Sequence, residues 1–162
     1  MTRRSPAALD RLMRELGVDL ALRYAGPAGF FEDADLDAAL TDRVPPRRDL
    51  MTASGLEAAD QLLANRLKTQ RGELAPLGHP DYGSRHHELI GEPNVERTRN
   101  LIKLHVLDAL SREPRIEKIL SCRVVAPDNP PRSDVRIVLE VRLIDEPNPL
   151  NLVVPFSLEV GS

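Results

Sequence analysis

The segment Ala109-Leu-Ser-Arg-Glu-Pro-Arg-Ile116 marks the change of secondary structure that decides the fold. A long helical pattern precedes it, and the chain after it alternates like strands almost to its end. Proline lacks an N–H and disfavours a helical residue before it, so the helix is expected to end by Glu113. Glu113 and Arg115 flank Pro114 with opposite charges, where the last carbonyls of the helix lack partners. This corner is therefore the first candidate for a functional site.

Two helices are predicted before the corner. The first covers residues 54–68, with Ser54 as its cap and Glu57 as the capping-box partner. The second begins after Pro93, with Asn94 as its cap. Both should pack an apolar face against the strands that follow.

The second helix carries leucines on both sides. One broad apolar face consists of Val95, Leu101, Ile102, Val106, Ala109 and Leu110. Leu104 and Leu107 project from the opposite side, which predicts a second cover from the N-terminal part of the chain or from another protein. Ahead of this helix, a shorter one is predicted at 84–90, with Ser84 as its cap.

Three strand patterns follow the corner, at 118–126, 134–143 and 152–160, joined as an antiparallel meander. Pro155 lies inside the third pattern, and a proline without an N–H to donate predicts a strand at the sheet edge. The expected fold is α+β, with helices packed on one face of a small antiparallel sheet. In the first strand, one face is expected to hold Leu120, Cys122, Val124 and Ala126.

The first 48 residues are predicted to form an N-terminal extension with little hydrophobic core of its own. A helix is predicted at 5–16, a short strand at 19–24 and an acidic helix at 32–42. The main domain is expected to cover 49–162.

Composition excludes several classes of protein. A net charge of −3 argues against broad nucleic-acid binding, which depends on clustered positive charge. We find no signal peptide, no apolar run long enough to span a membrane and no glycine-rich phosphate loop. The single cysteine, Cys122, cannot form an internal disulfide and reads, like His105, as a core residue.

The sequence gives only weak evidence for catalytic or metal-binding residues. His79, Asp81 and the pair His86–His87 match no metal-ligand spacing and read as solvated turn and helix residues. A glycoside hydrolase would need a carboxylate pair in a cleft, and such clefts are commonly aromatic. With three Phe, two Tyr and no Trp, this chain offers little for a sugar to stack on. We therefore expect no catalytic residue, cofactor or metal, although Glu73, Asp81, Glu88 and Glu113 are candidates by type.

For the corner itself, two interpretations remain open. Arg115 could pair locally with Glu113 or Glu117, or cap the end of the helix. Alternatively, an exposed guanidinium beside a rigid proline suits bidentate docking to another chain.

Taken together, several motifs resemble one family. These are Thr69, Gly72 and Glu73 in a first turn, Pro80, Tyr82 and Gly83 in a second, then Glu113-Pro114-Arg115-Ile116 and the strand tail. The combination is similar to the baseplate wedge protein of contractile phage tails, the gene-twenty-five-like (phage W) family. Relatives occur in type VI secretion baseplates, tailocins and extracellular contractile injection systems. The resemblance covers about residues 50–160.

The resemblance implies a structural role and no enzymatic activity. Glu113, Pro114 and Arg115 would dock on the larger wedge proteins, and the strands 134–143 and 152–160 would offer edges to the sheath protein. The implied edge residues are Val135, Ile137, Leu139, Val153, Pro155 and Ser157. The protein would be made in the cytoplasm and built in six copies into a particle, near tube and spike or hub proteins, without nucleic acid or membrane. A muralytic, lysozyme-like hydrolase and a free-standing adaptor are the alternatives.

Overall fold

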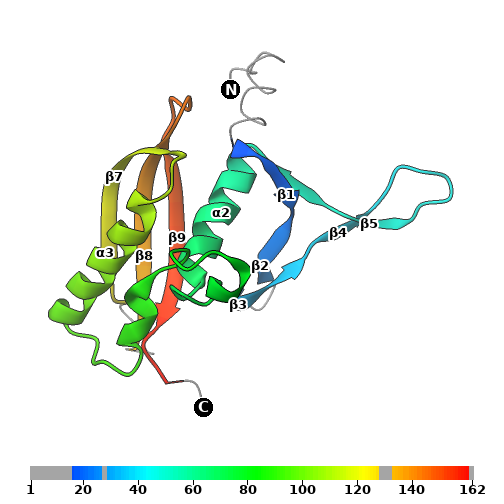
Figure 1. Ribbon diagram of the computed structural model, residues 1–162. Coiled ribbons are helices and arrows are strands. Elements are labelled where there is room, and N and C mark those ends of the chain that lie inside the picture. Colours follow the sequence, from blue (N-terminus) through cyan, green and yellow to red (C-terminus); the bar gives the residue numbers. More distant parts are fainter. Residues whose placement is uncertain (1–15, 27–28, 128–132, 161–162) are drawn as a thin grey trace. The chain divides into compact units, whose positions relative to one another are not determined.

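The computed structural model describes residues 16–26, 29–127 and 133–160. The chain divides between Leu62 and Leu63 into two compact units, and Figure 1 labels their helices and strands. The predicted helix 5–16 lies outside the described residues, apart from Leu16, which is helical.

Short antiparallel ribbons make up the first unit. Its strands are β1 (Val18–Leu20), β2 (Leu22–Gly26), β3 (Gly29–Leu36), β4 (Ala38–Leu40), β5 (Arg48–Leu50) and β6 (Thr52–Ser54). They pair as β1–β6, β2–β3 and β4–β5. The predicted acidic helix at 32–42 is therefore wrong, because backbone pairing places this segment in β3 and β4. The predicted strand at 19–24 is confirmed in part, divided between β1 and β2.

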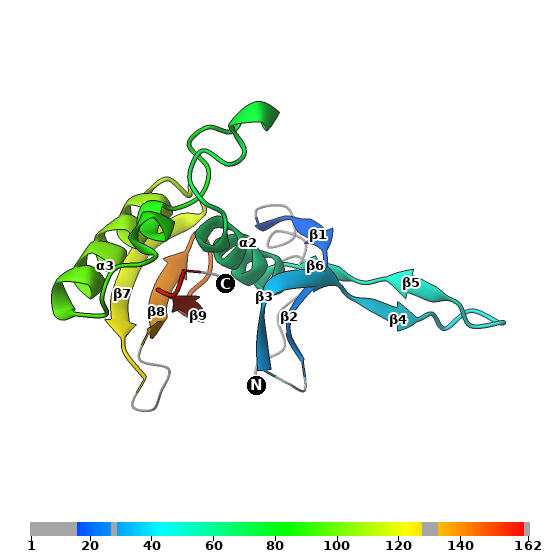
Figure 2. The ribbon, with the colours of Figure 1, turned by 90° about the horizontal axis from the view of Figure 1, so that it is seen from below.

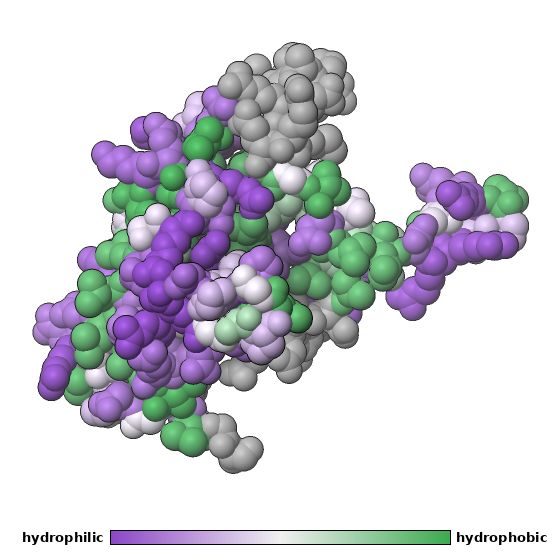
Figure 3. Space-filling view, in the orientation of Figure 1, coloured by the Kyte–Doolittle hydropathy of each residue, from purple (hydrophilic) through white to green (hydrophobic). Residues whose placement is uncertain are grey.

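The three ribbons of this unit meet at a closed ring of backbone hydrogen bonds. The N–H of Ala21 donates to the carbonyl of Met51 (2.8 Å), that of Met51 to Asp37 (2.9 Å) and that of Asp37 to Ala21 (2.9 Å). Because these residues separate consecutive strands, the ring joins the ribbons without a common sheet. The β4–β5 ribbon exposes apolar side chains, with Leu40 at 69% and Leu50 at 47% of their surface, and apolar residues are visible at its root (Figure 3).

The second unit contains the predicted helices and sheet. Helix α2 (Leu56–Lys68) enters it at Leu63 and is followed by the 3₁₀ turns η1 (Ala75–Leu77) and η2 (Arg85–Leu89) and by α3 (Glu96–Ser111). Both α-helices are confirmed, but their predicted caps are not. Ser54 ends β6, and the N-cap position of α3 is Val95. The predicted helix at 84–90 is a 3₁₀ turn, and the side chain of Ser84 does not cap it.

The sheet of this unit has the order β7–β8–β9, with β7 at Ile116–Val125, β8 at Asp134–Leu143 and β9 at Leu150–Ser157. All neighbours are antiparallel, so the predicted meander and the α+β class are confirmed. Helices α2 and α3 lie on the same side of the sheet (Figure 2). The core between them is aliphatic and includes Leu67, Ile102, Val106, Leu110, Val135, Ile137, Leu139 and Val141, all at most 1% exposed.

Strand β8 corrects one prediction about the sheet edges. Val135, Ile137 and Leu139 were expected to offer a free edge, but β8 pairs with β7 on one side and β9 on the other. Its backbone groups are therefore already used, and the three side chains point into the core. Strand β9 is an edge strand, as Pro155 predicted.

In β7, a register shift between Ile119 and Ser121 displaces the predicted inward face. Ile119 pairs with Val141 and Ser121 with Glu140, so Leu120 is the extra residue of a bulge. Leu120 is consequently 36% exposed, whereas Cys122 is buried as expected.

Candidate partner-binding corner

An ion pair stands at the centre of the corner. Glu113, just after α3, is 5% exposed, and its Oε2 accepts a hydrogen bond of 2.9 Å from a terminal guanidinium nitrogen of Arg66 in α2. The partners are 47 residues apart in sequence. Because no local pattern connects such distant residues, the sequence placed Arg66 on the helix but gave no sign of this pair.

Pro114 and Arg115 are the accessible part of the corner. Pro114 is exposed, and the side chain of Arg115 keeps 36% of its surface. The Nε of Arg115 lies 3.9 Å from Oε1 of Glu113, and the Arg115 backbone N–H donates to the same oxygen at 3.3 Å. The expected local pairing is thus present, but its side-chain distance exceeds that of a hydrogen bond. Glu113 is thus buried and fixes the backbone of Arg115, whereas the Arg115 side chain is partly exposed to solvent.

The turns at residues 69–73 and 80–83, which carry the two turn motifs, lie next to this corner. The Tyr82 ring lies 4.7 Å from the Arg66 guanidinium carbon, within cation–π range. The carbonyl of Thr69 accepts from the Ser84 N–H at 2.9 Å, and the N–H of Arg71 donates to the Ser84 carbonyl at 3.1 Å. The two turns are therefore joined through Thr69 and Ser84, and Tyr82 of the second turn contacts the ion pair.

A balanced network of exposed charges lies beside the corner. Arg71 contacts Asp81 at 2.6 Å and Asp108 at 3.5 Å, while Arg112 contacts Asp108 at 3.0 Å and Asp81 at 3.4 Å. The hydrogen bond and charge of Arg71 hold the pKa of Asp81 below its ordinary value. Figure 3 shows hydrophilic side chains over α3 and the adjoining loops.

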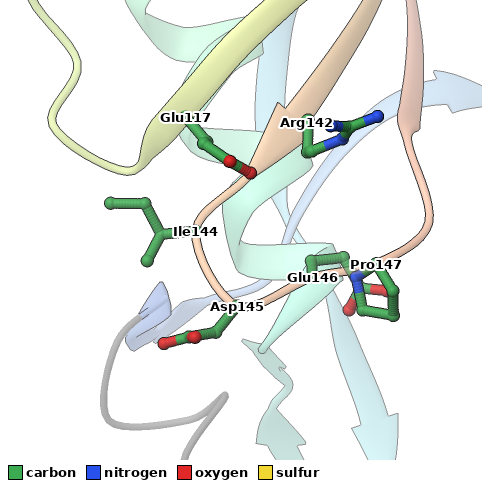
Figure 4. A pocket seen from close by; sticks show the side chains of 6 residues that line it. All are labelled: Glu117, Arg142, Ile144, Asp145, Glu146 and Pro147. Atoms are coloured by element: carbon green, nitrogen blue, oxygen red, sulfur yellow. The ribbon is translucent and has the colours of Figure 1, made fainter.

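A shallow pocket adjoins the same corner, where β8 leaves the sheet. Its lining consists of Glu117, Arg142, Ile144, Asp145, Glu146 and Pro147 (Figure 4). The N–H of Ile144 donates to the Arg115 carbonyl at 3.0 Å, so the pocket and the corner share a backbone contact. Ile144 is 43% exposed, which adds apolar surface beside Pro114 and Arg115.

The outer side of β9 is the second candidate surface. The Leu158 N–H donates to the Ser133 carbonyl at 3.1 Å, and bonding alternates along an antiparallel pair. Val153, Pro155 and Ser157 therefore direct their backbone groups away from β8. Within the described residues no strand pairs with that side of β9.

The histidines are packed more tightly than predicted. His86 is 1% exposed, so the expectation that it is solvated is wrong. Its Nδ1 lies 2.8 Å from the Ser84 hydroxyl, and its ring centroid is 4.5 Å from that of Phe156 on β9. His87 donates from Nε2 to the Leu67 carbonyl at 2.8 Å. No group of three His, Cys, Asp or Glu side chains in the described part of the chain could hold a metal ion.

The buried His86 predicts a stability that depends on pH. Burial, helped by the charges of His87 and His105, lowers its pKa from 6.5 to about 3. The unfolded chain therefore binds a proton that the folded chain excludes, and stability falls as the pH drops below about 6.5. Between pH 7 and pH 5 we expect this residue to lower the free energy of unfolding by about 2 kcal/mol.

Urea denaturation of His86→Asn should show a shallower pH dependence of stability. His79→Gln, which alters an exposed histidine, should keep the wild-type slope. Equal slopes for wild type and His86→Asn would contradict this assignment.

The carboxylates considered for hydrolysis do not form a catalytic pair. Glu73 is exposed and accepts the Gln70 N–H at 3.1 Å within its turn. The hydrogen bond from Arg85 lowers the pKa of Glu88, as Arg71 does for Asp81. A general acid requires the opposite shift. Glu113 is occupied by Arg66.

Comparison with known proteins gives a likeness to a solved structure. No protein-family model and no curated protein matches the chain. Among solved structures, a Geobacter sulfurreducens protein named provisionally as a tail lysozyme is 29% identical, with a TM-score of 0.58. The match covers 68% of this chain and 96% of that one. The chain resembles a tail protein. The neighbour's name combines association with a tail and lysozyme activity, and both are stated of that protein. No helix in the described residues is both long and apolar enough to cross a membrane.

Proposed function

We propose that this chain is a structural baseplate component of a contractile injection system or phage-tail-like particle. It links the wedge to the first sheath ring and initiates sheath assembly. The observation that carries the proposal is the tail-related neighbour, similar over 68% of this chain. Two surfaces of the same unit supply the means of coupling: the corner at Pro114 and Arg115, and the outer side of β9.

The corner suits attachment to the larger wedge proteins. Pro114 and Ile144 offer rigid and apolar surface, and Arg115 offers a guanidinium that can bind two acceptor atoms at once. Glu113 acts from within by holding the Arg115 backbone. With six copies in a particle, each attachment can be modest in strength, because avidity adds to it.

The edge of β9 suits the sheath. A sheath segment can add as a further strand, bonded to the backbone of Val153 and Ser157. Main-chain bonding depends little on side-chain identity, so it suits the start of a polymer. Of the six residues expected to bind the sheath, this leaves Val153, Pro155 and Ser157, since β8 has no free side.

Arg115→Ala tests the wedge half of the proposal. We expect binding to the larger wedge proteins to weaken about tenfold or more, because a charge-assisted bidentate contact is lost. Stability should change little, since the Arg115 Nε lies 3.9 Å from the Glu113 carboxylate, beyond hydrogen-bond distance. Co-expression followed by affinity measurement on the purified complex provides the readout. Arg85→Ala, which breaks an exposed pair with Glu88, is the matched control. A variant that unfolds would favour the purely local role, and unchanged binding would remove the corner from the proposal.

A muralytic role is the second candidate, and the neighbour's name favours it. Release of soluble fragments from purified peptidoglycan by this chain would support it, provided that Glu73→Gln abolishes the release. Absence of turnover by the assembled particle would leave the structural role.

A further inference from the structure

At the proposed docking corner, two guanidinium groups converge on one carboxylate. Arg66 approaches Glu113 to 2.9 Å with a side chain only 11% exposed, whereas Arg115 stays at 3.9 Å and is 36% exposed. The neighbouring network of Arg71, Arg112, Asp81 and Asp108 is balanced, with two charges of each sign. Of the four arginines in these contacts, Arg115 therefore has the longest distance to a carboxylate, at 3.9 Å.

The buried pair is not an efficient way to stabilise the fold. Removing two charges from water is costly, and apolar residues of similar size often replace such a pair without loss. Moreover, the Nε of Arg66 is buried without a hydrogen-bond partner among the described residues, which adds to the cost. A cluster with these properties is better explained by what it positions than by the stability it provides.

We propose that Arg66 and Tyr82 are positioning residues, and that Arg115 binds a carboxylate on the partner. Tyr82 lies against the Arg66 guanidinium, Arg66 fixes and neutralises Glu113, and Glu113 holds the backbone N–H of Arg115. The Arg115 guanidinium is then oriented outward beside Pro114. Its ligand is an Asp or Glu side chain, which matches the planar fork bidentately. This inference rests on the proposed docking function of the corner.

The double variant Arg66→Met/Glu113→Leu separates positioning from stability. The full chain should keep a urea midpoint close to wild type, because an apolar pair fills the same space. Binding to the co-expressed wedge proteins should nevertheless fall about tenfold or more, as in Arg115→Ala. Adding Arg115→Ala to the double variant should cause little further loss, because Arg115 is no longer oriented. Arg85→Met/Glu88→Leu, which replaces an exposed pair of the same unit, should bind like wild type.

The outcomes distinguish the two levels of the proposal. If Arg115→Ala binds like wild type, the docking function of the corner fails. If Arg115→Ala binds weakly but the double variant binds normally, docking stands and the positioning role is overturned.

A charge swap tests the identity of the ligand. Arg115→Glu should abolish binding, and changing one exposed Asp or Glu of the wedge protein to Arg should restore it. Failure of every such partner variant to restore binding overturns the carboxylate assignment.

Discussion

Replacing Glu113 by alanine is expected to lower the free energy of unfolding by about 4 kcal/mol, because Arg66 would remain buried without a counter-charge. Arg66 is 9% exposed and reaches Glu113 at 2.9 Å, so water cannot readily replace the lost carboxylate. Equilibrium urea denaturation of the full chain measures the effect. Such a loss is a large fraction of the roughly 5–15 kcal/mol that stabilises an ordinary domain, so the urea midpoint should fall clearly below that of the wild type.

Two further variants test whether this loss comes from the unpaired charge of Arg66. Arg66→Met/Glu113→Leu should recover most of the stability, within about 1 kcal/mol of wild type, because no charge is left unpaired. Arg115→Ala should unfold like wild type. If Glu113→Ala and the double variant lose equal stability, the effect comes from packing and not from Arg66.

Gly83→Ala is expected to cost about 3 kcal/mol through crowding and backbone strain. The φ angle of Gly83 is +96°, and an added Cβ would lie 2.6 Å from the Thr69 carbonyl oxygen and 2.8 Å from the Gln70 carbonyl carbon. These are backbone atoms, so they cannot turn aside as a side chain would. Thermal or urea unfolding of the purified chain gives the measurement.

Gly78→Ala provides the matched control for crowding. Gly78 has a similar φ of +88°, but an added Cβ would meet nothing within 4 Å. It should therefore lose only about 1 kcal/mol, the cost of a left-handed backbone conformation for alanine. Equal losses at Gly78 and Gly83 would show that close approach of the two turns is not the cause.

The sheet and the helices of the second unit could be predicted because their signals are local. Alternation along 134–143 and Pro155 in the last strand are read within a few residues, and both match the structure. An antiparallel meander places its second strand between the other two, so the predicted topology itself argues against Val135, Ile137 and Leu139 as edge residues.

Other features depend on pairing between distant segments. The acidic residues of 32–42 have helix-like spacing, yet the segment pairs as β3 and β4, because tertiary context overrides weak propensity. The bond between Arg66 and Glu113 likewise joins α2 to the residues that follow α3. The sequence identified Glu113 as a candidate but could not show that its carboxylate is internal.

The proline of β9 also limits what this edge can join. Its outer side offers N–H donors at Val153 and Ser157 but none at Pro155. A strand that pairs with this side therefore lacks one backbone hydrogen bond. Two copies of this chain placed edge to edge would each contribute such a gap, which disfavours uncontrolled aggregation through this side. A foreign segment aligned to leave that position unpaired would meet no such penalty. Pro155 can thus disfavour self-association while leaving the edge of β9 able to pair with a partner strand.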